Sequence, residues 1–134
     1  MKKWYIGLLI LTTVCSVGFI YIQETGTYER ANTIPQTGEA IVFFYSPTCE
    51  PCQGVKEEFI SIIKGSGWNV QWVDLSQLSA EDRIELKERY DLNMVPAIYH
   101  FQDGYAIEMH KGTEQIEEYN QTLLKLLEDY GTLP

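Results

Sequence analysis

The sequence predicts an α/β fold, a central mixed sheet flanked by helices, that follows an N-terminal transmembrane helix. Two observations support this prediction. Residues 4–22 carry no charged side chain, and nineteen residues are about the length needed to cross a bilayer as a helix. Beyond residue 38, short apolar or alternating runs typical of strands alternate with segments of helical periodicity. Such an alternation of strands and helices is typical of α/β domains.

Residues 1–23 are predicted to form a membrane anchor. Two lysines precede the uncharged stretch at residues 4–22, and Glu24 follows shortly after it. Because positive residues favour the cytoplasmic side, the N-terminus is expected in the cytoplasm and the remainder of the chain outside it. The predicted location is therefore the cell membrane, with a single pass and an extracytoplasmic C-terminal domain.

A cleaved signal peptide is the main alternative to an anchor. Residues 16–18, Ser-Val-Gly, are the nearest match to a cleavage site, but apolar sequence continues beyond them. Lipidation of Cys15 is a second alternative, and Val14 occupies the preceding position, where a small residue is expected. Cys15 is most simply a small apolar residue within a membrane helix.

The charge balance argues against nucleic acid as a partner. The chain has 10 basic and 19 acidic residues, and two of the basic residues precede the apolar stretch. Phosphate contacts require lysine and arginine, which are scarce in the remainder of the chain. An acidic surface commonly serves solubility, so the charge does not identify a substrate.

Residues 24–37 are predicted to be a linker, and residues 38–134 the folded domain. The linker contains Thr, Gly, Asn, Pro and Gln with little apolar periodicity, apart from a possible helical turn near residues 28–32. Residues 40–45 are continuously apolar, which is typical of a strand buried on both faces of a sheet. Residues 52–64 have helical spacing and end at a Gly-Ser-Gly.

Four further elements are expected in the second half of the chain. Residues 69–75 alternate aromatic and β-branched side chains as a strand, and Ser79 followed by Asp82 starts a helix that runs to Tyr90. Residues 97–101 and 105–110 are strands that flank an Asp-Gly hairpin signal. Residues 113–130 form a long amphipathic helix. The predicted order is β-α-β-α-β-β-α.

Cys49 and Cys52 are predicted to form the catalytic pair, and their disulfide is the only redox group required. They follow a buried strand and stand where a helix begins, and Pro51 suits the first turn of that helix. At the cap position, Cys49 can receive backbone N–H groups that lower the pKa of its thiol. Cys52 lies one turn inside and should be shielded. Cys49 is therefore expected to attack, and Cys52 to resolve the mixed disulfide.

Zinc binding and an inert disulfide are the competing interpretations of this pair. Tetrahedral zinc needs two more ligands, and the only histidines are His100 and His110 on the predicted hairpin. Structural zinc ligands usually lie in knuckles, whereas Cys49 directly follows a strand, so no metal is expected. An inert disulfide across so short a loop would remove little chain entropy and stabilise the fold weakly.

Three motifs resemble the thioredoxin superfamily over residues 38–130. Cys49-Glu-Pro-Cys52 follows Val-Phe-Phe-Tyr, Val95-Pro96 precedes Ala-Ile, and Phe-Gln-Asp-Gly comes next. The resemblance implies a thioredoxin-like fold in which the Val95–Pro96 peptide is cis and packs beside the cysteines. It also implies that Val95 offers its backbone to an extended substrate peptide, as in strand addition. Thr48, beside the first cysteine, is expected to contact the same peptide.

The sequence departs from thioredoxin itself at several positions. Phe43 replaces a buried Asp of that family, Thr48 replaces a Trp, and the N-terminal strand and helix are missing or reduced. These departures resemble small membrane-anchored extracytoplasmic thiol–disulfide proteins of Gram-positive bacteria, including those that accompany secreted bacteriocins. That resemblance implies protein thiols and disulfides as substrates, and a membrane redox partner that resets the cysteines.

The direction of the redox reaction depends on opposing signals. Glu50 places a negative charge beside Cys49, which raises the pKa of the thiol and favours a reductant. The Glu-Pro pair likewise resembles anchored reductants of cytochrome c maturation. The loss of the buried acid at Phe43, the valine before Pro96 and the oxidising compartment favour disulfide formation or isomerisation in secreted or surface proteins. That direction is the expectation, with a thiol reductant and a non-catalytic accessory module for an exporter as alternatives.

Overall fold

The computed structural model describes residues 34–134 of the protein. The predicted anchor at residues 1–23 and most of the predicted linker, including the helical turn near residues 28–32, lie outside the described residues. Within the part that is described, no helix combines the length and apolar character that a membrane span requires.

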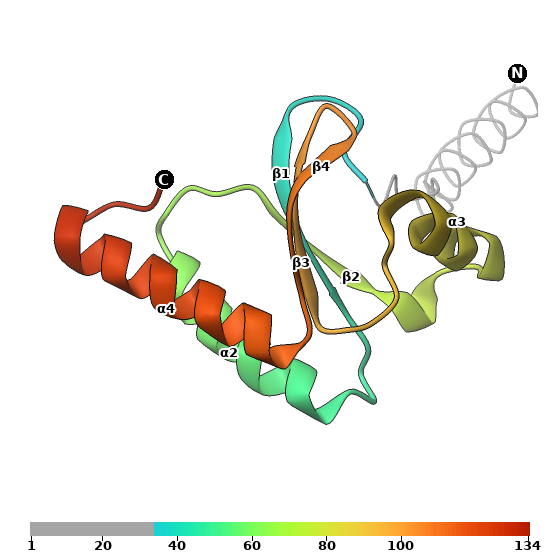
Figure 1. The fold of residues 1–134 in the computed structure, drawn as a ribbon, viewed down its shortest axis with the longest axis horizontal. Helices are drawn as coiled ribbons and strands as arrows, with labels where there is room; N and C mark the ends of the chain where they lie inside the picture. The colour runs from blue at the N-terminus through green and yellow to red at the C-terminus, as the bar shows by residue number, and fades with distance from the viewer. Residues whose placement is uncertain (1–33) are drawn as a thin grey trace, which may run out of the picture. The chain divides into compact units, whose positions relative to one another are not determined.

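The described elements follow the predicted order of strands and helices (Figure 1). The boundaries agree with the predicted ones to within one residue, except that the first helix begins two residues earlier, and a short 3-10 turn follows the second strand. The elements are β1 (Glu39–Tyr45), α2 (Glu50–Ile63), β2 (Val70–Asp74), η1 (Leu75–Gln77), α3 (Ala80–Tyr90), β3 (Ala97–Gln102), β4 (Tyr105–Lys111) and α4 (Thr113–Tyr130).

The four strands form a mixed sheet in the order β2-β1-β3-β4. Strand β1 is parallel to β2, and α2 makes the crossover that a parallel connection requires. Strand β1 is antiparallel to β3, which forms a hairpin with β4. Figure 1 shows α2 and α4 together on one face of the sheet and α3 on the other. The central position of β1 explains its continuous apolar sequence.

Side chains of β1 alternate between two hydrophobic clusters, one on each face of the sheet. Phe44 belongs to the cluster under α3, where its ring meets Tyr99 edge-on with 5.4 Å between centroids. Phe43 belongs to the cluster under α2 and α4, where its ring centroid lies 5.9 Å from that of Phe59. All four side chains are fully buried, so β1 is the strand on which both halves of the core are built.

Local side-chain chemistry sets the ends of several elements. The hydroxyl of Ser79 accepts a hydrogen bond from the Asp82 N–H at 3.0 Å, which confirms the predicted start of α3. Asp103 and Gly104 both have positive φ, 49° and 81°, as a two-residue hairpin turn between twisted strands requires.

The same hairpin turn is tied to the start of β1. The Gly38 N–H donates to a carboxylate oxygen of Asp103 at 2.8 Å, and the Asp103 N–H donates to the Gly38 carbonyl at 2.9 Å. These reciprocal bonds join positions 65 residues apart in the sequence. The chain therefore leads into the sheet at a fixed point, at the end of β1 opposite to the cysteines.

Tyr99 provides a test of the core through its dependence on pH. Its hydroxyl donates to the Tyr90 carbonyl at 3.0 Å, and burial, reinforced by the charge of Asp91, raises the pKa of Tyr99 to about 12. An unfolded tyrosine titrates near pH 10, so the folded state keeps a proton that the unfolded state loses as the pH rises above about 10. The stability that depends on this proton is present below that pH and is lost towards pH 12.

We therefore expect the free energy of unfolding to fall between about pH 9 and pH 11.5, and to fall less in Tyr99→Phe. At the lower pH the variant should be less stable by about 1 kcal/mol, because the Tyr90 carbonyl loses its donor. Urea unfolding of both proteins at both pH values measures this difference. An equal fall in the two proteins would show that Tyr99 does not contribute.

Candidate redox site

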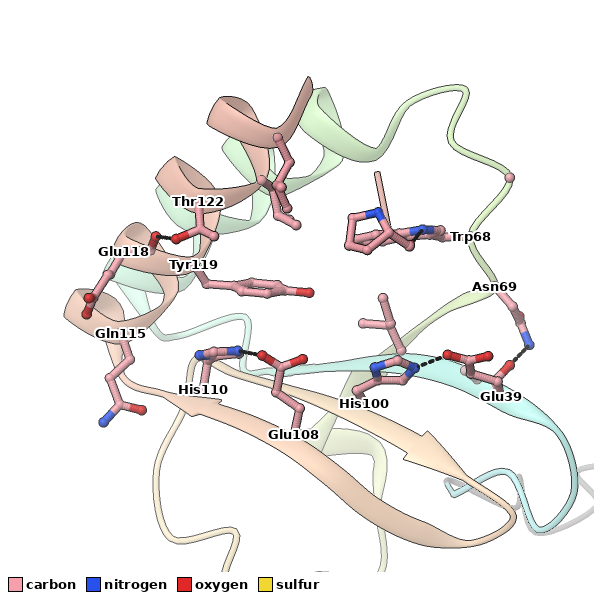
Figure 2. Close-up of a pocket in the computed structure, with 16 residues that line it drawn as sticks. Glu39, Trp68, Asn69, His100, Glu108, His110, Gln115, Glu118, Tyr119 and Thr122 are labelled. Carbon is pink, nitrogen blue, oxygen red and sulfur yellow. Dashed lines mark hydrogen bonds and ion pairs between the residues drawn. The ribbon is translucent and has the colours of Figure 1, made fainter. Parts of the chain in front are cut away.

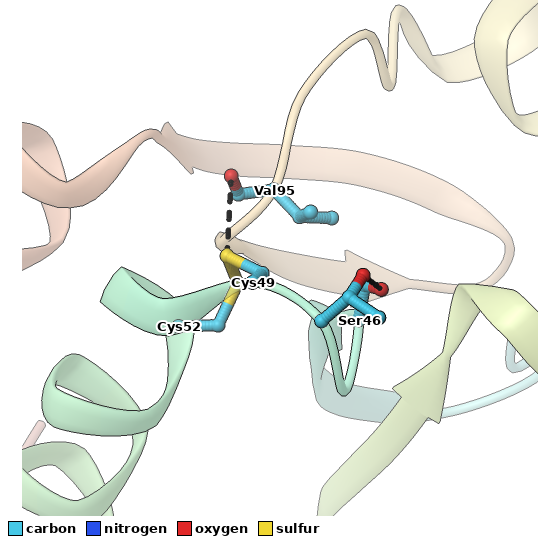
Figure 3. Close-up of a disulfide and its surroundings, with 5 residues drawn as sticks. Ser46, Cys49, Cys52 and Val95 are labelled. Atoms are coloured by element: carbon cyan, nitrogen blue, oxygen red, sulfur yellow. Dashed lines mark hydrogen bonds between the residues drawn. A yellow bond between two sulfur atoms is a disulfide. The ribbon is translucent and has the colours of Figure 1, made fainter.

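The loop between β1 and α2 brings both cysteines to the carboxyl end of the central strand (Figure 3). The Cys49 N–H donates to the Ser46 carbonyl at 3.1 Å, which closes a tight turn directly after the strand. The hydroxyls of Ser46 and Thr48 lie 3.0 Å apart across the same turn. A strand buried on both faces therefore fixes where the first cysteine stands.

Cys49 is the N-cap of α2, as the sequence predicts, but in the disulfide its sulfur accepts none of the expected backbone N–H groups. Its backbone is extended, with φ −88° and ψ 100°, and Pro51 lies in the first helical turn, where its missing N–H has no helical partner to lose. The Cys52 N–H donates to the Cys49 carbonyl at 3.2 Å. The positive end of the helix dipole therefore lies at Cys49 and favours negative charge on its sulfur.

The two cysteines form a disulfide and differ in exposure. The S–S distance is 2.05 Å, and the two Cα atoms lie 5.3 Å apart. Cys49 is half-buried, whereas Cys52 has no exposed surface and belongs to the inner face of α2. A thiol from solvent can therefore approach the Cys49 sulfur but not the Cys52 sulfur.

The Val95–Pro96 peptide lies beside the disulfide although it is far away in the sequence. The peptide is cis, Pro96 is buried and Val95 is half-buried. The Cys49 sulfur lies 4.0 Å from the Val95 carbonyl oxygen, 46 positions away (Figure 3). An oxidised sulfur carries no proton, so this approach is a contact in the disulfide and becomes an available hydrogen bond for the reduced thiol.

The remaining residues predicted around the site lie on its surface. Thr48, Glu50 and Pro51 are all exposed, Thr48 in the turn and the other two in the first turn of α2. Met94, which the sequence reasoning did not single out, is 51 % exposed beside Val95, with its sulfur against Gly112. The Gly112 N–H donates to the Pro96 carbonyl at 2.8 Å and anchors that end of β3 to the start of α4.

The side chains around Phe43 are apolar. The ring lies fully buried in the sheet, and its centroid is 5.3 Å from that of Trp72 on the neighbouring strand. The position at which thioredoxin itself is expected to carry a buried Asp is therefore filled by an apolar ring in this chain.

Lys56 is a charged residue near the site that the sequence reasoning missed. Its ammonium nitrogen lies 3.7 Å from the centroid of the Tyr45 ring and 5.3 Å from that of Trp72. The sequence did contain one signal for it: Lys56 follows Cys52 by four residues, and this spacing places both side chains on one face of a helix. That rings from two strands, Tyr45 of β1 and Trp72 of β2, approach the same ammonium group was not visible in the sequence.

The two histidines lie apart from the cysteines. A nitrogen of His100 lies 2.6 Å from the Glu39 carboxylate, and one of His110 lies 2.9 Å from the Glu108 carboxylate. Both pairs line a cavity of about 1050 Å³ between the sheet and α4, and neither cysteine lines it (Figure 2). Within residues 34–134, no three His, Cys, Asp or Glu side chains are grouped to hold a metal ion. The zinc interpretation therefore lacks its additional ligands in this part of the chain.

Tyr119 forms one wall of that cavity. Its ring stacks on His110 with 4.1 Å between centroids, and burial, reinforced by the charge of Glu108, raises the pKa of Tyr119 to about 12. Tyr119 is therefore neutral in the physiological range of pH.

Comparison with known proteins agrees with this geometry. The thioredoxin family model matches residues 22–125, which is most of the chain. Three similar solved structures are a thioredoxin pre-protein of Schistosoma mansoni, a thioredoxin variant of Halobacterium salinarum and the thioredoxin of Malassezia sympodialis. Their sequence identities are 18 %, 19 % and 17 %, each with a TM-score of 0.51.

The alignments cover 67 %, 75 % and 67 % of this chain, and 80 %, 84 % and 77 % of the respective structures. At these identities the likeness concerns the fold alone. The assignment of a family and an activity rests instead on the family match and on the Cys-x-x-Cys disulfide at the start of α2. This chain belongs to the thioredoxin family and is a thiol–disulfide oxidoreductase.

Proposed function

We propose that this protein is a membrane-tethered oxidoreductase that forms or isomerises disulfides in secreted or surface proteins. The observation that carries the proposal is the asymmetry of the Cys49–Cys52 disulfide. One sulfur is accessible at a helix N-terminus and beside the Val95 carbonyl, and the other is buried. This asymmetry supports a reaction in which a substrate sulfur bonds to Cys49 and never to Cys52.

The proposed oxidation has two exchange steps. A substrate thiolate attacks the Cys49 sulfur, the bond between the two cysteines breaks, and Cys52 leaves as a thiolate. A second substrate thiolate then attacks the substrate sulfur of the mixed disulfide, and Cys49 leaves as a thiolate. The substrate has lost two electrons to the cysteine pair, so a membrane redox partner must reoxidise the pair before the next cycle. No other cofactor takes part.

Val95, Pro96 and Thr48 are proposed to hold the substrate. The Val95 carbonyl borders the Cys49 sulfur, so an extended peptide that pairs with this backbone would bring its own cysteine alongside. Buried Pro96 keeps the Val95 peptide in place, and exposed Thr48 directly precedes Cys49 in the turn. Recognition through the backbone suits an enzyme that acts on many different sequences.

The proposed location rests on the N-terminal sequence. Residues 4–22 are uncharged and follow two lysines, which supports an anchor with the domain outside the cytoplasm. An oxidising compartment is also where disulfide formation is useful.

A thiol reductant is the second candidate, and Glu50 is the observation that favours it. Its carboxylate follows Cys49 directly at the start of α2. A negative charge there opposes the helix dipole and makes the thiolate less stable, and a less stable reduced form is a stronger reductant.

Selective alkylation tests the proposed roles of the two cysteines. In the reduced protein, iodoacetamide should modify Cys49 and leave Cys52 unmodified, because only the first sulfur is accessible. The pH dependence of that reaction should give Cys49 a pKa below about 8.5, the value of a free thiol. Peptide mapping by mass spectrometry separates both sites from Cys15. If the pKa of Cys49 equals that of a free thiol, and cells that carry Cys49→Ser show no change in phenotype, the protein would instead be a non-catalytic accessory module.

The reduction potential of the Cys49–Cys52 couple tests the direction. For an oxidant we expect a value nearer to about −120 mV than to about −270 mV. Equilibration with glutathione buffers, read out as the ratio of thiol to disulfide at the two cysteines, measures it. A potential near that of thioredoxin, about −270 mV, would contradict the oxidant and support the reductant.

Glu50→Gln tests whether the carboxylate tunes that potential. Removal of the negative charge should lower the pKa of Cys49 and shift the potential towards oxidising values. The change in pKa should be a few tenths of a unit, because Glu50 is exposed and screened by water and salt. Glu57→Gln, an exposed carboxylate further along α2, is the matched control. If Glu50→Gln and the parent protein have equal reduction potentials, Glu50 does not tune the couple.

A further inference from the structure

The geometry points to Lys56 as a positioning residue that stabilises the thiolate of Cys52 during exchange. This inference rests on the exchange reaction proposed above and adds a residue to it. Three features support the inference: the position of Lys56 on α2, the aromatic rings that contact its ammonium group, and the burial of Cys52.

Lys56 lies one helical turn after Cys52 on the same face of α2. Residues four apart on a helix have Cβ atoms about 5–6 Å apart, and long helical side chains lean back towards the N-terminus. The side chain of Lys56 therefore leans towards the turn that carries Cys52. It is half-buried between the helix and the sheet.

Two aromatic rings keep the ammonium group there. Tyr45 is the last residue of β1, and its ring centroid lies 3.7 Å from the Lys56 nitrogen. Trp72 supplies the second ring at 5.3 Å, and it is itself packed on Phe43 and Phe59, with centroids 5.3 Å and 6.2 Å apart. Cation–π contacts of this kind attract the ammonium group to the faces of the rings and favour one position for a flexible side chain.

The charge of Lys56 is not neutralised by an ion pair within residues 34–134. Asp74 lies opposite Tyr45 in the β1–β2 register, but one of its carboxylate oxygens accepts from the N–H and hydroxyl of Ser76 at 2.8 Å and 2.7 Å. On α2 itself, Glu58 accepts from the amide of Asn120 at 2.9 Å. Glu50 and Glu57 are exposed. Within residues 34–134 no carboxylate therefore lies within ion-pair distance of Lys56, and the helical spacing puts its charge one turn from Cys52.

Cys52 needs such a charge because it is fully buried. Burial in apolar surroundings disfavours a thiolate, and the other buried residues on the inner face of α2 are Val55, Phe59 and Ile62, all apolar. Yet Cys52 must leave as a thiolate when a substrate opens the disulfide, and must attack as a thiolate when it resolves a mixed disulfide. A nearby ammonium group lowers the free energy of that species in both directions of the reaction.

The pKa of Cys52 in the full chain carrying Cys49→Ser tests the inference. Lys56→Met keeps an unbranched side chain, one atom shorter, but removes the charge, and it should raise the pKa of Cys52 by about one unit. Lys56→Arg keeps the charge and should leave the pKa close to the parent value. Lys64→Met removes an exposed lysine just beyond the end of α2 and is the matched control. Titration of the Cys52 ¹³Cβ resonance by NMR resolves this thiol from Cys15.

The rate at which reduced glutathione opens the Cys49–Cys52 disulfide gives a second measurement. The rate should fall about threefold in Lys56→Met. A rise of one unit in the pKa of the leaving thiol lowers the logarithm of the exchange rate by roughly half a unit. Urea unfolding of each variant shows whether the fold is intact. Unchanged Cys52 pKa and rate in a folded Lys56→Met would overturn this inference alone. A parent protein whose disulfide does not exchange with glutathione would instead overturn the proposed function.

Discussion

The rest of the structure depends on the burial of strand β1. The strand pairs with β2 on one edge and β3 on the other, and its alternating side chains enter two separate clusters. A strand enclosed in this way cannot shift its register without moving every side chain to the wrong face. Its carboxyl end is therefore a rigid platform, and the turn that follows delivers Cys49 to the start of α2.

The buried side chains packed around this end of β1 are apolar. Phe43 and Trp72 form an aromatic pair that packs on Phe59 of α2, the helix that carries Cys52, so that helix rests on a layer of low polarity. In such surroundings a single charge has a larger effect than it would in water. Glu50 in solvent and Lys56 over its two rings thus act with unequal strength, although both lie within two turns of the cysteines.

Much of the fold and the location of the cysteine pair could be predicted from the sequence, because the responsible signals are local. The apolar run of β1, the Ser79 cap and the Asp103–Gly104 turn each act over a few residues. The Lys56 site could not be predicted, because it needs the β1–β2 register that places Trp72 opposite Phe43. The His100–Glu39 pair depends in the same way on the pairing of β3 with β1, whereas His110 and Glu108 lie two residues apart on β4. The membrane anchor at residues 1–23 stays a prediction from composition.

The reciprocal hydrogen bonds between Gly38 and Asp103 have a mechanical consequence. Any tension that reaches the domain through the preceding chain is applied at this clamp and then along the axis of β1. The hydrogen bonds to β2 and β3 lie across that axis, so they resist the load together in shear instead of opening one at a time. The cysteines stand at the far end of a seven-residue strand, about 20 Å from the clamp. Pulling on a tether would therefore strain the base of the sheet before it disturbed the chemistry.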